Sequence, residues 1–492
     1  MTTKLNNVNG VVNLSMLMDF YEFTMANGYF KKGFEDRIAY FDMFFRRVPD
    51  NGGYAIMAGV EQLVEYLENL SFSDDDLDYL RDNGIKDSGF LNYLRVFKLK
   101  CDVWAIPEGM PIFPGEPIIK VRGPIIQAQL IETMILLTIN HQCLIATKAN
   151  RICRAAAGRP VSEFGSRRAQ GAHGALMGAR AAYIGGCVST ACTMAAQNFD
   201  IPLAGTMAHS WVQMFDSEIE AFRAYADIYP DRCTFLVDTY NTVKSGVPNA
   251  IKVMNEVIVP RGFRPNAIRI DSGDMTYLSK TARRMLDDAG FPDCKILASN
   301  SLDEYIIRDI LIQGACIDIF GVGEKLITSK SEPIFGGVYK LAGIEDESGN
   351  IIPKIKMSEN VDKLTTPGSK QVVRLFSENN GKAIADVVKL DSEIIDETTP
   401  FVLFDPAHTW KRKSVSDFYT LPLLKQIVMS GRLVYESPSL QVIRDFCSKQ
   451  VDTLWEEILR FENPQMYYVD LSQELWDMKY DLLRRMSEVV NA

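Results

Sequence analysis

The sequence feature that most constrains the fold is a series of short apolar runs, each of which ends in polar residues. The runs cover residues 160–164, 201–204, 234–237, 267–270, 295–298 and 316–320. Successive runs begin about 20 to 40 residues apart, which is the spacing of strand–helix units in a parallel sheet. Helix-like segments fill the gaps, for example residues 275–289 and 303–313.

The pattern predicts an α/β fold whose central domain is an irregular, TIM-like α/β-barrel. Parallel strands present their carboxyl ends at one face, and in α/β barrels that face carries the active site. An open doubly wound sheet is the alternative, because ligands gather at carboxyl ends there too. The barrel is favoured because polar residues follow every run rather than only a few of them.

The segments on either side of these runs have different patterns. Residues 1–145 combine a helix that begins near Asp19 with an alternating strand at 38–45, which predicts an N-terminal α/β domain. Residues 146–342 hold the repeated units and form the predicted α/β-barrel catalytic domain. Residues 343–492 are turn-rich at first and then mostly helical. We expect a helical C-terminal extension there, strands then helices, that packs back on the N-terminal domain.

Composition narrows the class of protein. The 492 residues are 47% hydrophobic and 24% charged, which is ordinary for a soluble globular chain. The net charge of −10 argues against general binding to nucleic acid or to anionic membranes. The apolar stretch 130–146 contains Glu132, Asn140 and His141, so it predicts a buried helix rather than a membrane span. Nine cysteines without metal-type spacing, and no signal-like start, predict reduced thiols, no zinc site and a cytoplasmic location.

One basic stretch breaks the acidic trend. Residues 148–180 contain seven lysines and arginines but a single acid, Glu163. Arg167 and Arg168 follow a strand end beside a glycine, where guanidinium groups suit a bidentate grip on phosphate or carboxylate. The arginines before them are explained as well by a solvated helix face. The stretch therefore predicts a small anionic ligand.

His209 is the most reactive candidate at the predicted strand ends. It is one of four histidines and stands in residues 205–210, directly after the run at 201–204. Imidazole changes most easily between base, cation and nucleophile near neutral pH. Taken alone, the motif would fit a capping or core-edge histidine equally well.

Glycines and charged residues at other strand ends extend this predicted site. Gly321 and Gly323 follow the last run, where glycine lets backbone N–H groups approach a phosphate, although a simple turn also fits. Asp238 and Asp271 end two earlier runs and could hold Mg²⁺ or bind sugar hydroxyls. Arg269 lies inside an apolar run, so it needs an internal carboxylate or an anionic ligand.

Taken together and in this order, the motifs resemble the nicotinate phosphoribosyltransferase family of the barrel-type class. The matching segments are residues 19–25, 163–171, 205–210, 237–240, 269–274, 321–323 and 336–341, with further likeness at 114–117 and 460–475. The resemblance spans nearly the whole chain. It implies formation of nicotinate mononucleotide and pyrophosphate from nicotinate and 5-phosphoribosyl 1-pyrophosphate, coupled to ATP hydrolysis, in NAD salvage. It also implies Mg²⁺ and a homodimer with shared active sites.

The resemblance further implies a role for each matching residue. His209 would be the histidine that ATP phosphorylates, and Asp238 and Asp271 would act with it near the ribose or its Mg²⁺. The residues around nicotinate would be Tyr21, Arg167, Thr206 and Arg269, with Tyr21 donated across the dimer interface. The residues that bind 5-phosphoribosyl 1-pyrophosphate would be Gly321, Gly323, Glu324, Ser272 and Gly273.

Glu324 departs from the family pattern, which often has threonine at this position next to the sugar phosphate. A carboxylate facing phosphate would repel it. We therefore expect Glu324 to offer its backbone N–H and turn its side chain away, or Lys325 to compensate its charge.

Other functions fit the residues less well. A nicotinamide-using relative would carry an aspartate near the position of Val188, and an apolar residue beside arginines favours an acid substrate. The shorter and more basic pattern of quinolinate phosphoribosyltransferase is not evident. A catalytically silent sensor of a nucleotide or phosphosugar on the same scaffold is a further alternative. An aldolase-type barrel would need a lysine at a strand tip, and the runs lack one.

Overall fold

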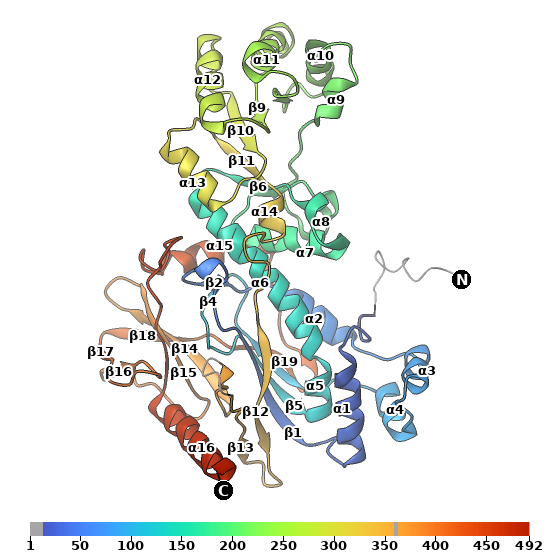
Figure 1. The fold of residues 1–492 in the computed structure, drawn as a ribbon, viewed down its shortest axis with the longest axis vertical. Coiled ribbons are helices and arrows are strands. Elements are labelled where there is room, and N and C mark those ends of the chain that lie inside the picture. The colour runs from blue at the N-terminus through green and yellow to red at the C-terminus, as the bar shows by residue number, and fades with distance from the viewer. Residues whose placement is uncertain (1–12, 359–362, 492) are drawn as a thin grey trace. The chain divides into compact units, whose positions relative to one another are not determined.

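The computed structural model describes residues 13–358 and 363–491 and divides into two compact units. Unit 1 combines the chain up to Leu144 with the chain from Ile334 onward, and unit 2 is the continuous segment Ile145–Pro333 (Figure 1). The division after Leu144 lies next to the predicted boundary at 145. The second division precedes Ile334, whereas the sequence placed it after residue 342.

Unit 2 is built on a parallel sheet. Within the described residues the six strands follow the order β7-β6-β11-β10-β9-β8, and every pairing between them is parallel. The strands are β6 (Val161–Glu163), β7 (Ser189–Thr190), β8 (Thr234–Leu236), β9 (Ala267–Ile270), β10 (Lys295–Ser299) and β11 (Ile319–Val322). Five of the predicted runs are therefore strands, and the α/β class is confirmed. The order leaves β7 and β8 as edges, so the sheet is parallel without a closed barrel being evident.

The run at 201–204 is the exception among the predicted strands. Only Leu203 forms a bridge, parallel to Thr190, and Pro202 has no N–H with which to continue a ladder. The edge position belongs instead to β7, a short strand of polar residues that the apolar pattern did not indicate.

Helices follow the strands of unit 2, as the spacing predicts. They are α7 (Gly171–Ile184), α8 (Thr193–Phe199), α9 (His209–Gln213), α10 (Glu218–Ile228), α11 (Val247–Val253), α12 (Met275–Asp288), α13 (Glu304–Ile312) and α14 (Glu324–Ile327). The helices expected at 275–289 and 303–313 correspond to α12 and α13. Asp274 and Asp303 cap them by accepting hydrogen bonds from the N–H groups of Tyr277 and Ile306.

Unit 1 joins the two ends of the chain in common sheets. One sheet has the order β13-β12-β1-β5-β3-β19-β20, and another has the order β18-β14-β15-β21. Their strands are β1 (Ile38–Phe44), β3 (Asp102–Ala105), β5 (Ile119–Pro124), β12 (Val338–Glu345), β13 (Ile351–Pro353), β14 (Lys370–Ser377), β15 (Ala383–Leu390), β18 (Phe418–Pro422), β19 (Lys425–Met429), β20 (Arg432–Leu433) and β21 (Val469–Leu471). Because β12 pairs antiparallel with β1, the segment after residue 334 belongs to this unit.

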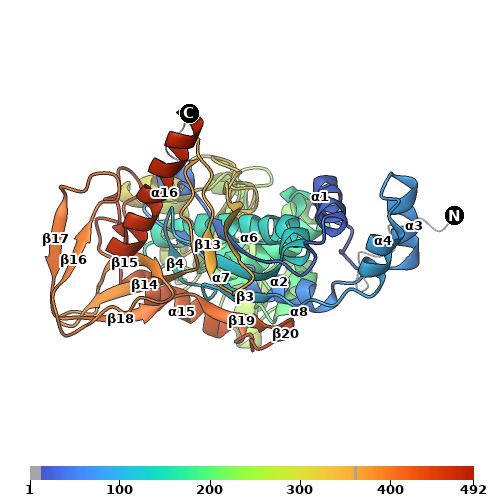
Figure 2. The same cartoon turned by 90° about the horizontal axis from the view of Figure 1, so that it is seen from below.

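The remaining elements of unit 1 are short strand pairs and helices. The strand pairs are β2 (Ala55–Ile56) with β4 (Pro111–Ile112), and β16 (Phe401–Phe404) with β17 (Arg412–Val415). The helices are α1 (Phe20–Lys31), α2 (Val60–Asn69), α3 (Asp74–Asp82), α4 (Ser88–Arg95), α5 (Ile125–Leu130), α15 (Leu440–Asp452) and α16 (Gln473–Asn491). Figure 2 shows β16 and β17 at the opposite end of this unit from α3 and α4. The C-terminal region thus mixes strands and helices, and a helical extension is not confirmed.

The apolar stretch near residue 130 is a core helix. The helical segment Ile125–Ala155, which includes α6 (Glu132–Ala155), is long and apolar enough to cross a membrane, but 67% of its most apolar window is buried inside the protein. This burial agrees with the predicted buried helix.

A fully buried ion pair links β14 and β15 in unit 1. Arg374 donates to both carboxylate oxygens of Asp386 at 2.7 Å, and both side chains are completely buried. Tyr467 donates to the same carboxylate at 2.9 Å, and Arg374 also donates to the Pro111 carbonyl oxygen at 2.8 Å. Burial without these partners would be costly for either charge.

Asp386→Ala should therefore destabilise unit 1 by about 3–5 kcal/mol, because it leaves the Arg374 charge buried and unpaired. Chemical unfolding followed by circular dichroism measures the change. Asp78→Ala, which removes the exposed partner of Arg81, is the control and should change stability by less than about 1 kcal/mol. Equal effects of the two substitutions would contradict the assignment.

Candidate functional site

A cavity of about 540 Å³ lies within unit 2, where the strands of its sheet end. Its lining comes from the segments that follow β6, β7, β9, β10 and β11 and from residues 205–208. Of the predicted site residues, the lining includes Arg167, Thr206, Arg269, Asp271, Gly321, Gly323 and Glu324. The carboxyl ends of the strands therefore meet as the sequence predicted.

Arg269 is held in the cavity wall by three neighbours. Its Nε donates to Ser299 Oγ at 2.9 Å, its Nη1 to Thr206 Oγ1 at 2.9 Å, and its Nη2 to Asp271 Oδ1 at 2.7 Å. The guanidinium carbon lies 5.7 Å from the centre of the Phe164 ring. The internal carboxylate that the sequence required for Arg269 is thus Asp271, and the guanidinium still borders the cavity.

Asp271 and Asp238 form a linked pair of carboxylates. The backbone N–H of Asp271 donates to Asp238 Oδ2 at 3.0 Å, and the Ser272 hydroxyl donates to the same oxygen. Burial raises the pKa of Asp271, but the Ser299 hydrogen bond and the Arg269 charge outweigh it and hold that pKa below its ordinary value. Asp271 is therefore ionised near neutral pH. The other oxygen of Asp238, Oδ1, is buried and has no hydrogen-bond partner.

His209 lies at the start of α9 beside these carboxylates. Its Nδ1 is 3.1 Å from Thr239 Oγ1, and its Nε2 is 3.8 Å from Asp271 Oδ2. The side chain is 39% exposed, so it is not a core histidine. The imidazole thus has one nitrogen held by a hydroxyl and the other beside a carboxylate, within reach of solvent.

The glycines after β11 allow a close approach to the turn after β6. A Cβ atom at Gly321 would lie 2.7 Å from the Phe164 ring, and one at Gly323 would lie 2.9 Å from the Phe164 carbonyl oxygen. The turn after β6 is itself fixed by the buried Glu163, which accepts hydrogen bonds from the Gly165 N–H and from Thr190 Oγ1. Glycine at 321 and 323 is therefore required by packing, whatever ligand the turn binds.

The charge of Glu324 is compensated mainly by Lys330, with smaller contributions from Arg168 and Lys325. Lys330 Nζ lies 2.7 Å from Glu324 Oε1, and Arg168 Nε lies 3.8 Å from Oε2. The Lys330 hydrogen bond is the main cause that lowers the pKa of Glu324. Lys325 donates to Asp303 at 2.5 Å, and its charge contributes less than that of Lys330 to the lowered pKa of Glu324.

The structure also shows site residues that were not predicted from the sequence. Ser299 joins Arg269 to Asp271, and Thr239 holds His209. Asn300 and Ser301 line the cavity with positive φ values of 84° and 48°, a strained backbone that is typical of functional loops. Serine and threonine at strand ends are too common to single out from sequence alone.

Tyr21 and Val188 are not part of this hydrogen-bonded network. Tyr21 belongs to α1 of unit 1 and is 44% exposed, so its contribution across a dimer interface stays a prediction. Val188 donates its backbone N–H to the Val161 carbonyl oxygen at 2.9 Å and has a half-buried side chain. Its part in substrate choice also stays a prediction.

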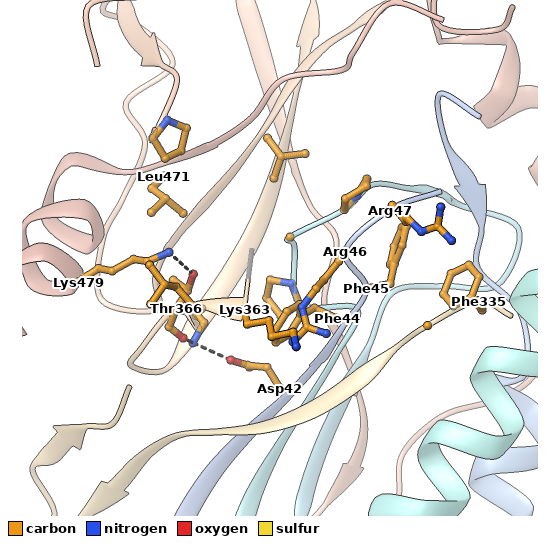
Figure 3. Close-up of a pocket in the computed structure, with 18 of the residues that line it drawn as sticks. Asp42, Phe44, Phe45, Arg46, Arg47, Phe335, Lys363, Thr366, Leu471 and Lys479 are labelled. Carbon is orange, nitrogen blue, oxygen red and sulfur yellow. Dashed lines mark hydrogen bonds and ion pairs between the residues drawn. The ribbon is translucent and has the colours of Figure 1, made fainter. Parts of the chain in front are cut away.

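A second cavity, of about 620 Å³, lies within unit 1 (Figure 3). Its basic lining residues are Arg46, Arg47, Lys363, Lys370 and Lys479. Asp42 is the acid among them and pairs with Lys370 at 2.7 Å. Burial, together with the neighbouring Lys370 charge, lowers the pKa of Lys479 to about 8. This cavity is suited to anions, but the imidazole and the paired carboxylates lie in unit 2.

Among the described residues, no group of three or more histidine, cysteine or acidic side chains is arranged to hold a metal ion by itself. A metal at Asp238 and Asp271 would have to take its remaining ligands from water or substrate.

Comparisons with known proteins agree with these observations. Residues 16–140 match the model of the nicotinate phosphoribosyltransferase N-terminal domain, and residues 369–479 match that of the C-terminal domain. A nicotinate phosphoribosyltransferase of Bacillus subtilis is 43% identical over 97% of this chain and 96% of its own length. The human nicotinate phosphoribosyltransferase is 30% identical over 94% of this chain and 95% of its own length.

Solved structures show the same relationship. The crystal structure of human nicotinic acid phosphoribosyltransferase matches with a TM-score of 0.82 and 28% identity, covering 95% of this chain and all of that one. A nicotinate-nucleotide pyrophosphorylase of Pyrococcus furiosus shares the fold with a TM-score of 0.70 at 24% identity, over 90% of this chain and 96% of its own. By its identity to these relatives over nearly its full length, the chain belongs to the nicotinate phosphoribosyltransferase family.

Proposed function

We propose that the protein transfers the phosphoribosyl group of 5-phosphoribosyl 1-pyrophosphate to nicotinate, producing nicotinate mononucleotide and pyrophosphate for NAD salvage. The observation that carries this proposal is the joining of Arg269, Asp271 and Asp238 in one hydrogen-bonded network at the cavity wall. The family relationship supplies the substrates, and this network supplies groups that fit them.

The site offers complementary groups for both substrates. The carboxylate of nicotinate can pair with the guanidinium of Arg269 or Arg167, and Thr206 lies beside Arg269. Backbone N–H groups of the glycine turn at 321–323 suit the sugar phosphate. The ring nitrogen of nicotinate then bonds to the anomeric carbon while the bond to pyrophosphate breaks, through a cation-like transition state. Asp271 and Asp238 supply negative charge close to that developing cation.

His209 would couple ATP to this transfer. An imidazole nitrogen takes the terminal phosphoryl group of ATP, and ADP leaves. The phosphohistidine gains about two negative charges, to which neighbouring dipoles and cations respond. The exposure of His209 and its position beside Asp271 support this role, because the added charge would act directly on the network that holds Arg269.

Mg²⁺ fits the pair Asp238 and Asp271. Among the residues that the structure describes, Asp238 Oδ1 is a buried oxygen without a hydrogen-bond partner. Asp271 Oδ2 lies 3.8 Å from His209 Nε2, while the other oxygen of each carboxylate already accepts hydrogen bonds. Two such oxygens leave most of an octahedron to water and substrate phosphates, as Mg²⁺ prefers. When bound, the ion would neutralise the leaving pyrophosphate.

The finer features of the family expectation belong to the same proposal. They are an irregular α/β-barrel formed around the parallel sheet of unit 2, a cytoplasmic homodimer, and Tyr21 of one subunit stacking on nicotinate in the site of another. The exposure of Tyr21 supports the last feature, because an aromatic ring on the surface is available to a second subunit.

The purified protein should convert nicotinate and 5-phosphoribosyl 1-pyrophosphate to nicotinate mononucleotide with Mg²⁺, and ATP should accelerate the reaction. Chromatography of products with nicotinate or nicotinamide as the base measures the preference. Faster turnover of nicotinamide would favour the nicotinamide-using alternative. Saturable binding without release of pyrophosphate would favour a silent sensor.

His209→Ala and His209→Asn should abolish the stimulation by ATP and leave a slow, uncoupled transfer, because neither side chain accepts a phosphoryl group. Rates with and without ATP measure this, and intact mass should show an added phosphoryl group only on the unsubstituted protein. Full ATP stimulation in either variant would refute the role of His209.

Gly321→Ala should displace the Phe164 ring and reduce kcat/KM about tenfold or more, since a packed ring does not yield without moving its neighbours. Gly28→Ala is the control, because a Cβ atom at Gly28 would meet nothing within 4 Å. Steady-state kinetics of both variants provide the measurement. Unchanged kinetics of Gly321→Ala would show that the contact between β11 and Phe164 does not shape the site.

A further inference from the structure

Ser299 is the last residue of β10 and lies between the two strand ends that carry the site. β10 pairs with β9 on one side and with β11 on the other, with Leu297 opposite Arg269 and Ser299 opposite Gly321. The Ser299 residue is 3% exposed. The parallel register therefore fixes a small hydroxyl directly beside Arg269 and Asp271.

The Ser299 hydroxyl uses its donor and an acceptor on two different site residues. Its oxygen accepts from Arg269 Nε at 2.9 Å, and its proton is donated to Asp271 Oδ1. Arg269 Nη2 donates to the same Asp271 oxygen at 2.7 Å, which closes a three-membered cycle of hydrogen bonds. A hydroxyl can occupy this position because it is both donor and acceptor, whereas lysine, carboxylate or methyl groups cannot do both.

This cycle determines how Arg269 faces the cavity. An arginine side chain has five N–H donors, and three of those of Arg269 are used by Ser299, Thr206 and Asp271. The bond at Nε fixes the rotation of the guanidinium plane, which the bonds at Nη1 and Nη2 alone would leave less constrained. The two remaining donors are then available to a ligand at a defined position.

We propose that Ser299 is a positioning residue that orients Arg269 for the carboxylate of the pyridine substrate and thereby contributes to the preference for nicotinate over nicotinamide. The inference rests on the proposed function. It concerns a residue that touches no reacting atom and acts through Arg269 and Asp271.

The test compares Ser299→Ala, Ser299→Cys and Ser299→Thr with the unsubstituted protein. Loss of one hydrogen bond to a charged group should raise the KM for nicotinate about tenfold in the Ala and Cys variants, with kcat reduced less than about threefold. The KM for nicotinamide should stay unchanged, because an amide does not form an ion pair with Arg269. Ser299→Thr keeps the hydroxyl and should retain the KM for nicotinate within about threefold.

Ser279→Ala is the matched control. Ser279 is 1% exposed, its hydroxyl accepts from the Cys316 N–H at 3.1 Å, and it donates to the Thr276 carbonyl oxygen at 3.3 Å, away from the cavity. Ser279→Ala should lose comparable stability while keeping the KM for nicotinate. Thermal unfolding of every variant separates folding from positioning, and Ser299→Cys carries the test if Ser299→Ala does not fold.

The outcomes separate the inference from the proposed function. Nicotinate turnover by the unsubstituted protein together with an unchanged KM for nicotinate in Ser299→Ala and Ser299→Cys overturns the positioning role alone. Equal changes in Ser279→Ala also overturn it. Absence of nicotinate turnover by the unsubstituted protein overturns the proposed function, and the inference falls with it.

Discussion

The ion pair between Arg269 and Asp271 at the end of β9 is the interaction on which the site depends. A charge within an apolar strand is tolerable only with a partner, and Asp271 provides one at 2.7 Å. The carboxylate of Asp271 also faces His209, and the backbone N–H of Asp271 donates a hydrogen bond to Asp238. Asp271, which stabilises the buried charge of Arg269, thus also lies next to the predicted phosphorylated histidine and the second predicted Mg²⁺ ligand.

The strands of unit 2 were largely readable from the sequence, because a buried parallel strand needs a continuous apolar run. The exceptions have local causes. Pro202 interrupts an apolar run that would otherwise be a strand, and the polar pair Ser189–Thr190 forms β7 although it has no apolar signal. The sequence placed the segment from Val338 in the central domain, but it forms β12 and pairs with β1, because the sequence of a strand does not specify its partner strand.

Seven of the predicted site residues line one cavity, whereas the hydrogen bonds between them could not be predicted from the sequence. Arg269 and Asp271 lie there because parallel strands end at one face, and Thr206 follows Leu203, which forms a bridge to Thr190 of β7. Which hydroxyl joins them depends on the register between β9 and β10, and no residue in either strand encodes that register by itself. Sequence adjacency suggested Lys325 as the partner of Glu324, but the turn that follows α14 brings Lys330 into the ion pair with it.

Unit 1 is interrupted in sequence by the whole of unit 2, and this has a consequence for biosynthesis. Strand β1 leaves the ribosome early, yet Tyr40 finds Glu345, its hydrogen-bond partner near the end of β12, only 305 residues later. Unit 2 is one continuous segment of chain, so it can form its own sheet before β12, the partner strand of β1, has been synthesised. Until β12 is synthesised, the edge of β1 that β12 will pair with keeps its backbone N–H and C=O groups without those partners, so completion of this sheet is a late step of folding.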